Sequence, residues 1–197
     1  FPLAVGLVVF ILLTTWKKGR ALLAAQAALG AMPVDLFLKS ASARSQRVAG
    51  TAVFLTHNTE GVPSALLHNV KHNKVMHERS LLMTGMVEQV PHSDPGDQLE
   101  VRALAPGFFR GFLRYGFQDD PDVPRALARS EAFGATFNIL DTSFFLSRRT
   151  LLADGKWGMP LWQDKLFISL SKQATTATDF FAIPSDRVVE LGAQVTI

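Results

Sequence analysis

The chain opens with an uncharged and mostly apolar run, FPLAVGLVVFILLTTW (residues 1–16). This run is slightly shorter than the roughly 20 apolar residues that a helix needs to cross a bilayer. No methionine and no basic segment come before it, so it does not resemble a secretory signal peptide. We therefore expect residues 1–16 to be the end of a transmembrane helix whose beginning lies upstream. The alternative is a buried core helix of a soluble protein.

Basic residues follow this apolar run at once, because Lys17, Lys18 and Arg20 come directly after Trp16. Tryptophan is common where a membrane helix meets water, and lysine and arginine gather on the cytoplasmic side. The pattern predicts a membrane interface formed by these four residues. It also predicts that the chain after them lies in the cytoplasm.

The next segment, residues 17–46, is predicted to be a basic juxtamembrane helix followed by a linker. Its alanine- and leucine-rich part favours a helix, and Met32-Pro33 should end or bend that helix. Residues 40–45 are typical of a linker. Between Lys17 and Arg47 there are six basic residues and a single acid, Asp35. Such a stretch would lie against anionic lipid headgroups.

From residue 47 to 197 the pattern changes to short apolar runs separated by turn residues, which indicates one cytosolic α/β domain. The fold class expected is α/β, with a mixed β-sheet of about five or six strands and packed helices, preceded by the truncated transmembrane helix and the juxtamembrane helix. Strands are expected at 50–56, 78–90, 99–105, 108–117 and 187–197, with one or two more within 135–152. Helices are expected at 61–74, 119–133 and 159–178, the last because Trp162, Leu166 and Leu170 are four apart with Phe167 beside them.

The location of the charge argues against a nucleic-acid-binding protein. The chain has 20 basic and 17 acidic residues. Outside the stretch from Lys17 to Arg47, 14 basic residues (20 less 6) face 16 acidic ones (17 less 1). A nucleic-acid binder usually spreads a basic face over its folded domain, so no nucleic-acid partner is expected. The absence of cysteine excludes disulfides and thiolate chemistry.

Three of the five histidines, His68, His72 and His77, lie within ten positions. On a helix His68 and His72 would share one face and could hold zinc as two imidazoles. Such a site needs further ligands, and the HExxH arrangement that would supply a base is absent. Helical histidine pairs of this kind are more often surface or packing residues. We therefore expect no metal at His68 and His72, and no cofactor.

The sequence nominates no catalytic residue. It contains neither a G-x-S-x-G nucleophile motif nor a G-x-x-x-x-G-K-[ST] or G-x-G-x-x-G phosphate-binding motif. The loop THNTEGVPS (56–64) could present backbone N–H groups to an anion, as many α/β loops could. The alternative function left open is a membrane-anchored, metal-dependent enzyme that would use His68, His72 and an acid such as Glu60 or Glu78.

Several long blocks of the chain closely resemble the potassium uptake transporters of the Kup (Kup/HAK/KT) family. They are RVAGTAVFLTHNTEGVPSALLHNVKHNKVMHERSLLMT (47–84), GFFRGFLRYGFQDDPDVPRAL (107–127), FFLSRRTL (144–151), GMPLWQDKLFISLSKQATTATDFF (158–181) and IPSDRVVELGAQVTI (183–197). The opening twenty residues also resemble the close of that family's final transmembrane helix and its basic exit. The blocks follow one another in order and cover nearly the whole chain.

The resemblance implies a proton-coupled potassium importer, which is not an enzyme, in the cell inner (plasma) membrane. The full protein would have about a dozen membrane helices, and potassium and the proton would be its substrates. The residues that bind the ion would lie in earlier helices, so no ion-binding residue is expected in this fragment, which should not transport by itself.

The resemblance also implies that the cytosolic module regulates or assembles the transporter, with its own transmembrane domain, the bilayer and a second copy of the chain as candidate partners. Some relatives respond to a cyclic dinucleotide, but no residue here identifies such a pocket. In this interpretation His68, Asn69, His72 and Asn73 end a helix through polar contacts, and Arg79 begins the next strand. The residues expected at a regulatory or interdomain contact are His57, Asn58, His68, Lys71, His72, Asn73 and Arg79.

Overall fold

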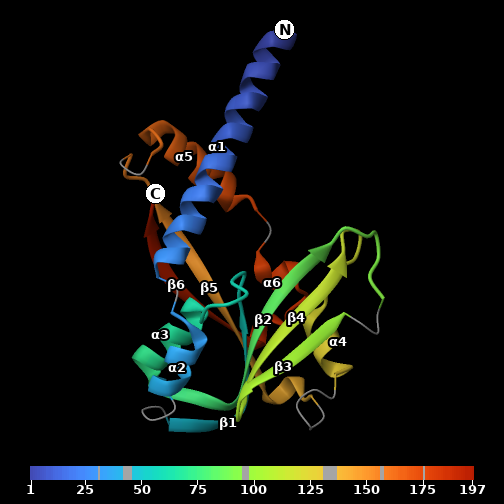
Figure 1. Ribbon diagram of the computed structural model, residues 1–197. Helices are drawn as coiled ribbons and strands as arrows, with labels where there is room; N and C mark the ends of the chain where they lie inside the picture. The colour runs from blue at the N-terminus through green and yellow to red at the C-terminus, as the bar shows by residue number, and fades with distance from the viewer. Residues whose placement is uncertain (31, 42–45, 95–97, 131–136, 156–157, 175) are drawn as a thin grey trace. The chain divides into compact units, whose positions relative to one another are not determined.

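A computed structural model describes residues 1–30, 32–41, 46–94, 98–130, 137–155, 158–174 and 176–197 (Figure 1). The chain divides into two compact units. The helical unit comprises Phe1–Ala31, Arg148–Thr175 and Gly192–Ile197, and the sheet unit comprises Met32–Ser147 and Thr176–Leu191.

The strands form one six-stranded mixed sheet, which confirms the predicted α/β class. They are β1 (Gln46–Leu55), β2 (Val75–Glu88), β3 (Leu99–Ala105), β4 (Phe108–Gly116), β5 (Thr142–Leu152) and β6 (Val188–Thr196). Their order is β3-β4-β2-β1-β5-β6, and β1 pairs in parallel with both β2 and β5, as β2 does with β4. The antiparallel strand β3 joins β4 through a tight turn at Gly107, whose φ of 74° suits glycine.

The helices are α1 (Pro2–Leu29), α2 (Val34–Ala41), α3 (Ser64–Asn73), α4 (Val123–Ala128), α5 (Leu161–Lys172) and α6 (Ala177–Phe180), with 3-10 turns at Ile139–Asp141 and Ser185–Arg187. The first helix runs unbroken from the apolar opening through the basic residues, and Pro33 lies between it and α2. The linker predicted at 40–45 begins later than expected, because α2 extends to Ala41. Residues 42–45 lie outside the described residues.

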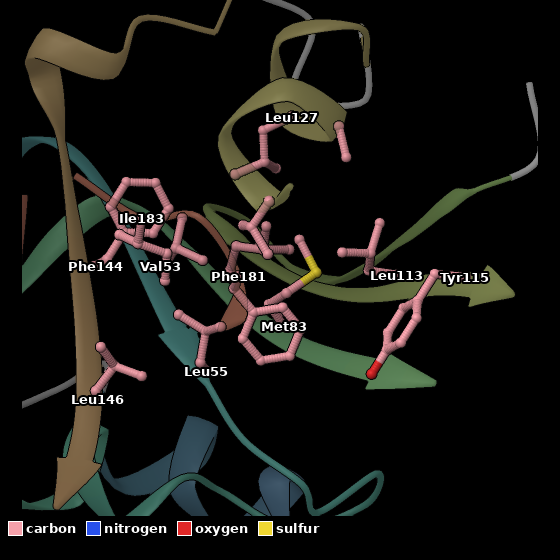
Figure 2. Packing of buried hydrophobic residues seen from close by; sticks show 13 residues of the cluster. Val53, Leu55, Met83, Leu113, Tyr115, Leu127, Phe144, Leu146, Phe181 and Ile183 are labelled. Atoms are coloured by element: carbon pink, nitrogen blue, oxygen red, sulfur yellow. The ribbon is translucent and has the colours of Figure 1, made fainter. Parts of the chain in front are cut away.

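Both faces of the sheet are covered within the sheet unit. Odd-numbered side chains such as Val53, Met83 and Leu113 join α4 and the segment after α6 in one buried cluster. Figure 2 shows Met83 and Phe181 in the middle of this cluster, with Tyr115 at one end. Even-numbered side chains pack with α2 and α3 in a second cluster, which contains Ala52, Phe54, Leu82, Phe108, Phe37, Ala65 and Leu66. Residues 52–55 are therefore consecutively buried, as the continuous apolar run of β1 predicts.

Three predicted elements differ from the structure at their ends. The strand β2 begins at Val75, so Arg79 lies inside the strand and does not start it as predicted. The helix expected at 119–133 is described only as Val123–Ala128, because the Asp122 side chain accepts from the Arg125 amide and caps the helix there. The helix expected at 159–178 is two helices, because the Thr176 side chain caps a new helix by accepting from the Asp179 amide.

In the helical unit, α5 packs against α1 and the last residues of β5 and β6. Its buried cluster contains Met159, Phe167 and Ile197, with Leu151 and Val195 packed against it. The Ile197 amide donates to the Leu152 carbonyl and the Ile197 carbonyl accepts from the Asp154 amide, which is the hydrogen-bond pattern of parallel strands.

The exposed side of α5 differs from what its apolar spacing predicts. The spacing places Trp162 on a buried apolar face, but 53% of it is exposed. The helix instead buries Phe167 and the carboxylate of Asp164, which accepts a hydrogen bond of 2.8 Å from the Gly155 amide. Of the four apolar residues that indicate this helix, Phe167 is thus buried and Trp162 is exposed.

Candidate functional site

The first half of α1 exposes apolar side chains on every side. Leu7, Phe10 and Leu13 are 60%, 64% and 65% exposed. The Thr14 hydroxyl donates to the Phe10 carbonyl at 2.7 Å, so its hydrogen-bonding potential is met inside the helix. Among the described residues, one helix, Pro2–Ala28, is long and apolar enough to cross a membrane. Exposed apolar surface of this kind marks a place where a partner or lipid binds.

The residues predicted to meet the membrane surface are held together by one turn of α1. Lys17, Lys18 and Arg20, here called the basic collar, are all exposed. Trp16 is half-buried, with its ring centroid 5.5 Å from that of Phe167 in α5. Gly19 is buried on the side of α5, and a Cβ at this position would collide with the Phe167 ring. One side of this turn therefore packs in the protein and the other presents three positive charges.

The His68 and His72 rings lie on one face of α3, as their spacing predicts. Their centroids are 5.9 Å apart and the rings are stacked. His72 is exposed and His68 is half-buried. Among the described residues, no group of three or more histidine, aspartate or glutamate side chains could hold a metal ion.

Two asparagines beside these histidines close the turn from α3 into β2. Asn69 is 2% exposed, and its amide donates to the Val75 carbonyl at 3.2 Å. The Asn69 side-chain oxygen accepts a hydrogen bond from the side-chain amide of Asn73 at 2.8 Å. Lys74 follows in a left-handed conformation with φ 57° and ends the helix. The predicted polar helix end is real, and its contacts come from the asparagines.

His77 and Arg79 lie within β2 and Lys71 lies exposed on α3. The His77 ring packs edge-on against Phe145 with centroids 5.8 Å apart, and burial lowers the His77 pKa. The His77 carbonyl accepts from the Arg47 guanidinium at 2.9 Å. His77 thus serves the packing of the sheet, and the structure does not bring it together with His68 and His72 into one site.

The loop after β1 occupies the place where open α/β sheets often bind ligands, because β1 has parallel neighbours on both sides. Several of its backbone N–H donors are used within the fold. The Asn58 side chain accepts from the amides of Glu60 and Gly61, each at 2.9 Å. The Ala65 amide at the start of α3 donates to the Ser147 hydroxyl at 3.1 Å. His57 lies exposed in the same loop. These internal bonds argue against the anion site considered for this loop.

Arg110 is a buried charge that the sequence did not single out. It is 7% exposed, and its guanidinium donates to the Gly61 carbonyl at 3.0 Å, which fixes the loop to β4. Burial lowers the Arg110 pKa, and the nearby Glu60 carboxylate opposes this shift. The sequence indicates the burial of Arg110 only through its spacing: it lies two positions from the core residue Phe108, on the same side of β4.

A pocket of about 270 Å³ lies beside α4 and the end of β4. Three arginines and three aspartates line it, so neither sign of ligand charge is favoured: Arg114, Arg125, Arg129, Asp119, Asp120 and Asp122. Two of the aspartates already serve the fold, because Asp122 caps α4 and Asp119 binds the loop before β3. The pocket therefore defines no ligand class.

Asp119 holds that loop with several hydrogen bonds. Its carboxylate accepts from the amides of Gly116 and Ser93 at 2.8 and 2.9 Å, and lies 2.7 Å from the His92 ring. The Ser93 amide, the His92 ring and the Gly116 amide hold the Asp119 pKa well below its usual range. Asp119 is therefore a centre of local structure.

Comparison with known proteins identifies the family. Residues 49–197 match the family model described as K+ potassium transporter C-terminal domain, and the chain belongs to this family. No solved structure matches the chain. Because the family's members are potassium transporters, which are not enzymes, the metal-dependent enzyme that was left open is not favoured.

The relatives are similar along the whole chain. It is 48% identical to the "Probable potassium transport system protein Kup" of Erythrobacter litoralis, 52% identical to the "Probable potassium transport system protein Kup 2" of Paramagnetospirillum magneticum and 50% identical to the Kup protein of Aromatoleum aromaticum. All of this chain is covered in each comparison, but only 32%, 31% and 31% of the relatives. The chain thus spans about a third of their length and corresponds to their C-terminal part.

The different roles of the asparagines and the histidines can be tested by substitution. Asn69→Ala should lower the free energy of unfolding by about 1–3 kcal/mol, because it removes the two side-chain hydrogen bonds that the buried Asn69 makes with the Val75 carbonyl and the Asn73 side-chain amide. The exposed His72→Ala is the matched control and should change it by less than about 0.5 kcal/mol. Urea unfolding in detergent micelles measures both. A stoichiometric metal that His72→Ala removes would contradict this account.

Asp119 should make stability depend on pH in one direction. A carboxylate whose pKa is depressed on folding adds stability above its unfolded pKa, and loses it as the pH falls through the folded value. Asp119→Asn should therefore lower the unfolding midpoint at pH 7, and the difference from wild type should shrink below about pH 3.9. The exposed neighbour Asp120→Asn serves as the control. A difference that stays constant with pH would rule out this role for the carboxylate.

Proposed function

We propose that this chain is the C-terminal part of a proton-coupled potassium uptake transporter of the cell inner (plasma) membrane. The observation that carries the proposal is α1, whose exposed apolar half leads directly into the basic collar, in a chain that belongs to a potassium transporter domain family. The relatives are named as potassium transport proteins and continue for about twice the length of this chain beyond it. In this proposal potassium and the proton are bound by residues outside the fragment.

The proposed organisation follows the charge pattern. Residues 1–16 end the last transmembrane helix, residues 17–46 form the juxtamembrane segment, and residues 47–197 form the cytosolic α/β domain. The bilayer would accept the exposed apolar side chains, and the anionic headgroups would face the basic collar. The unbroken course of α1 supports a direct mechanical connection between the membrane segment and the juxtamembrane segment.

The cytosolic domain is proposed to regulate or assemble the transporter. No described residue set forms a metal-binding cluster, and the loop after β1 uses its donors internally, which favours a binding or packing role over chemistry. A homodimer remains part of this proposal. The candidate contact surface consists of His57, Asn58, His68, Lys71, His72, Asn73 and Arg79, and all of these except His68 and Arg79 are exposed. Any partner can alter transport only by binding two arrangements of the domain with different affinities.

The orientation of the domain can be tested through the basic collar. Replacing Lys17, Lys18 and Arg20 together by glutamate removes the positive charge that should keep this end in the cytoplasm. In cells, a reporter fused after Arg47 should lose at least about half of its cytoplasmic signal in this variant. The matched control carries the reporter after Ile197 and replaces the exposed Lys71 and Lys74 by glutamate, which should leave its cytoplasmic signal unchanged. A cytoplasmic signal that the collar variant leaves intact would reject the proposed topology.

A further inference from the structure

The helix α5 has two apolar sides, of which only one belongs to a buried core. Ile168 packs against the buried cluster that contains Phe167, as the strand-end residues Leu151 and Val195 do. Leu166 and Leu170 are each two positions from Ile168, and are therefore turned by about 200° to the other side of the helix. Trp162 extends this second row by one more helical turn. None of the three row residues belongs to the buried cluster of the helical unit as described.

The position of α5 along α1 is fixed by close contacts. Phe167 lies against Trp16 and Gly19, so α5 meets α1 at the level of the basic collar. Figure 1 shows α5 running across α1 and not along it. If α1 crosses a bilayer, a helix that runs across it at this level lies in the plane of the headgroups.

The residues that pack with α5 indicate which way each of its two apolar sides faces. Ile168 shares its cluster with Leu22 and Leu23, which come after the basic collar in α1. The row of Trp162, Leu166 and Leu170 is on the opposite side of α5, toward the uncharged half of α1. Its first member is 53% exposed.

The charge of the helical unit fits an anionic surface. Its sequence contains eight basic residues and two acidic ones, and one of the two acids, Asp164, is fully buried. Lys165 and Lys172 are exposed on the outer side of α5, in addition to the basic collar on α1. Basic side chains around an apolar row are the pattern of a helix that lies at an anionic membrane surface.

We propose that α5 is an interfacial helix that binds anionic phospholipid headgroups next to the exit of α1. The row of Trp162, Leu166 and Leu170 contacts the boundary between headgroups and acyl chains, and Lys165 and Lys172 bind lipid phosphate. This inference rests on the proposed function, because it needs α1 to cross the bilayer. It adds a second, non-spanning attachment of the chain to the membrane, which would hold the end of α1 at a fixed depth.

Because the chain has no cysteine, a single cysteine can carry a fluorescent label at any chosen position. The test uses the full chain in vesicles of phosphatidylcholine and phosphatidylglycerol, with a nitroxide-labelled lipid as the quencher. A label at Trp162→Cys should be quenched at least about twofold more than one at Leu161→Cys. Leu161 is the matched control because it is apolar, 47% exposed and adjacent, but seven positions from Ile168 and thus on its side of α5.

Two further positions make the outcome decisive. Ser169→Cys lies close to the direction of Trp162 on an exposed position, and should show the same quenching if the tryptophan variant folds poorly. Leu7→Cys reports on α1 itself. Strong quenching at Leu7 with equal, weak quenching at Trp162, Ser169 and Leu161 would overturn the α5 inference and leave the spanning helix intact. No quenching at Leu7 would reject the spanning helix, and the inference with it.

A label at Trp162 that is shielded from water but not quenched by the lipid nitroxide would show that protein, such as a second copy of the chain, covers the row. That result would also overturn the proposal. In vesicles of phosphatidylcholine alone, quenching at Trp162 should fall by about half or more, because the lysines then lack anionic headgroups. Equal quenching in both kinds of vesicle would contradict the proposed role of Lys165 and Lys172.

Discussion

The close approach of α1 and α5 at Gly19 is the contact on which the rest of the helical unit depends. A glycine leaves room for the fully buried ring of Phe167, and that ring brings together Trp16 of α1 and the ends of β5 and β6. The same turn of α1 also carries the exposed Lys17 and Lys18. One side of this turn therefore packs against α5, and the other side carries positive charge. A helix with this division can face lipid before the turn and protein after it.

The sheet unit shows which features a pattern of side chains can predict. Alternating and continuous apolar runs predicted the strands well, because each strand is buried on one or both faces. The ends of the helices were harder to predict from the sequence. The starts of α4 and α6 depend on single capping side chains, those of Asp122 and Thr176, which have no periodic signal. The spacing on α5 predicted a helix, but could not tell which apolar side faced the core.

Sequence patterns were also a poor guide to which polar residues make the important contacts. The histidines attracted attention because three of them are close in sequence, yet the structure separates His77 from the pair on α3. Arg110 and Asp119 make decisive polar contacts, and nothing in the sequence distinguishes them from exposed residues of their kind. Their roles depend on backbone groups that only the folded chain brings near them. The family, in contrast, was identifiable from the sequence, because long blocks of residues carry it.

The account depends most on α1 having one surface for the protein and another for its surroundings, with Gly19 as the point of contact. The most direct test compares Gly19→Ala with Gly6→Ala, two identical changes in one helix, by thermal unfolding in detergent micelles. A Cβ at Gly6 meets nothing within 4 Å, whereas at Gly19 it collides with the Phe167 ring. Gly19→Ala should lower stability by roughly 1–3 kcal/mol, and Gly6→Ala should leave it unchanged or slightly higher. Equal effects of the two substitutions would contradict the account.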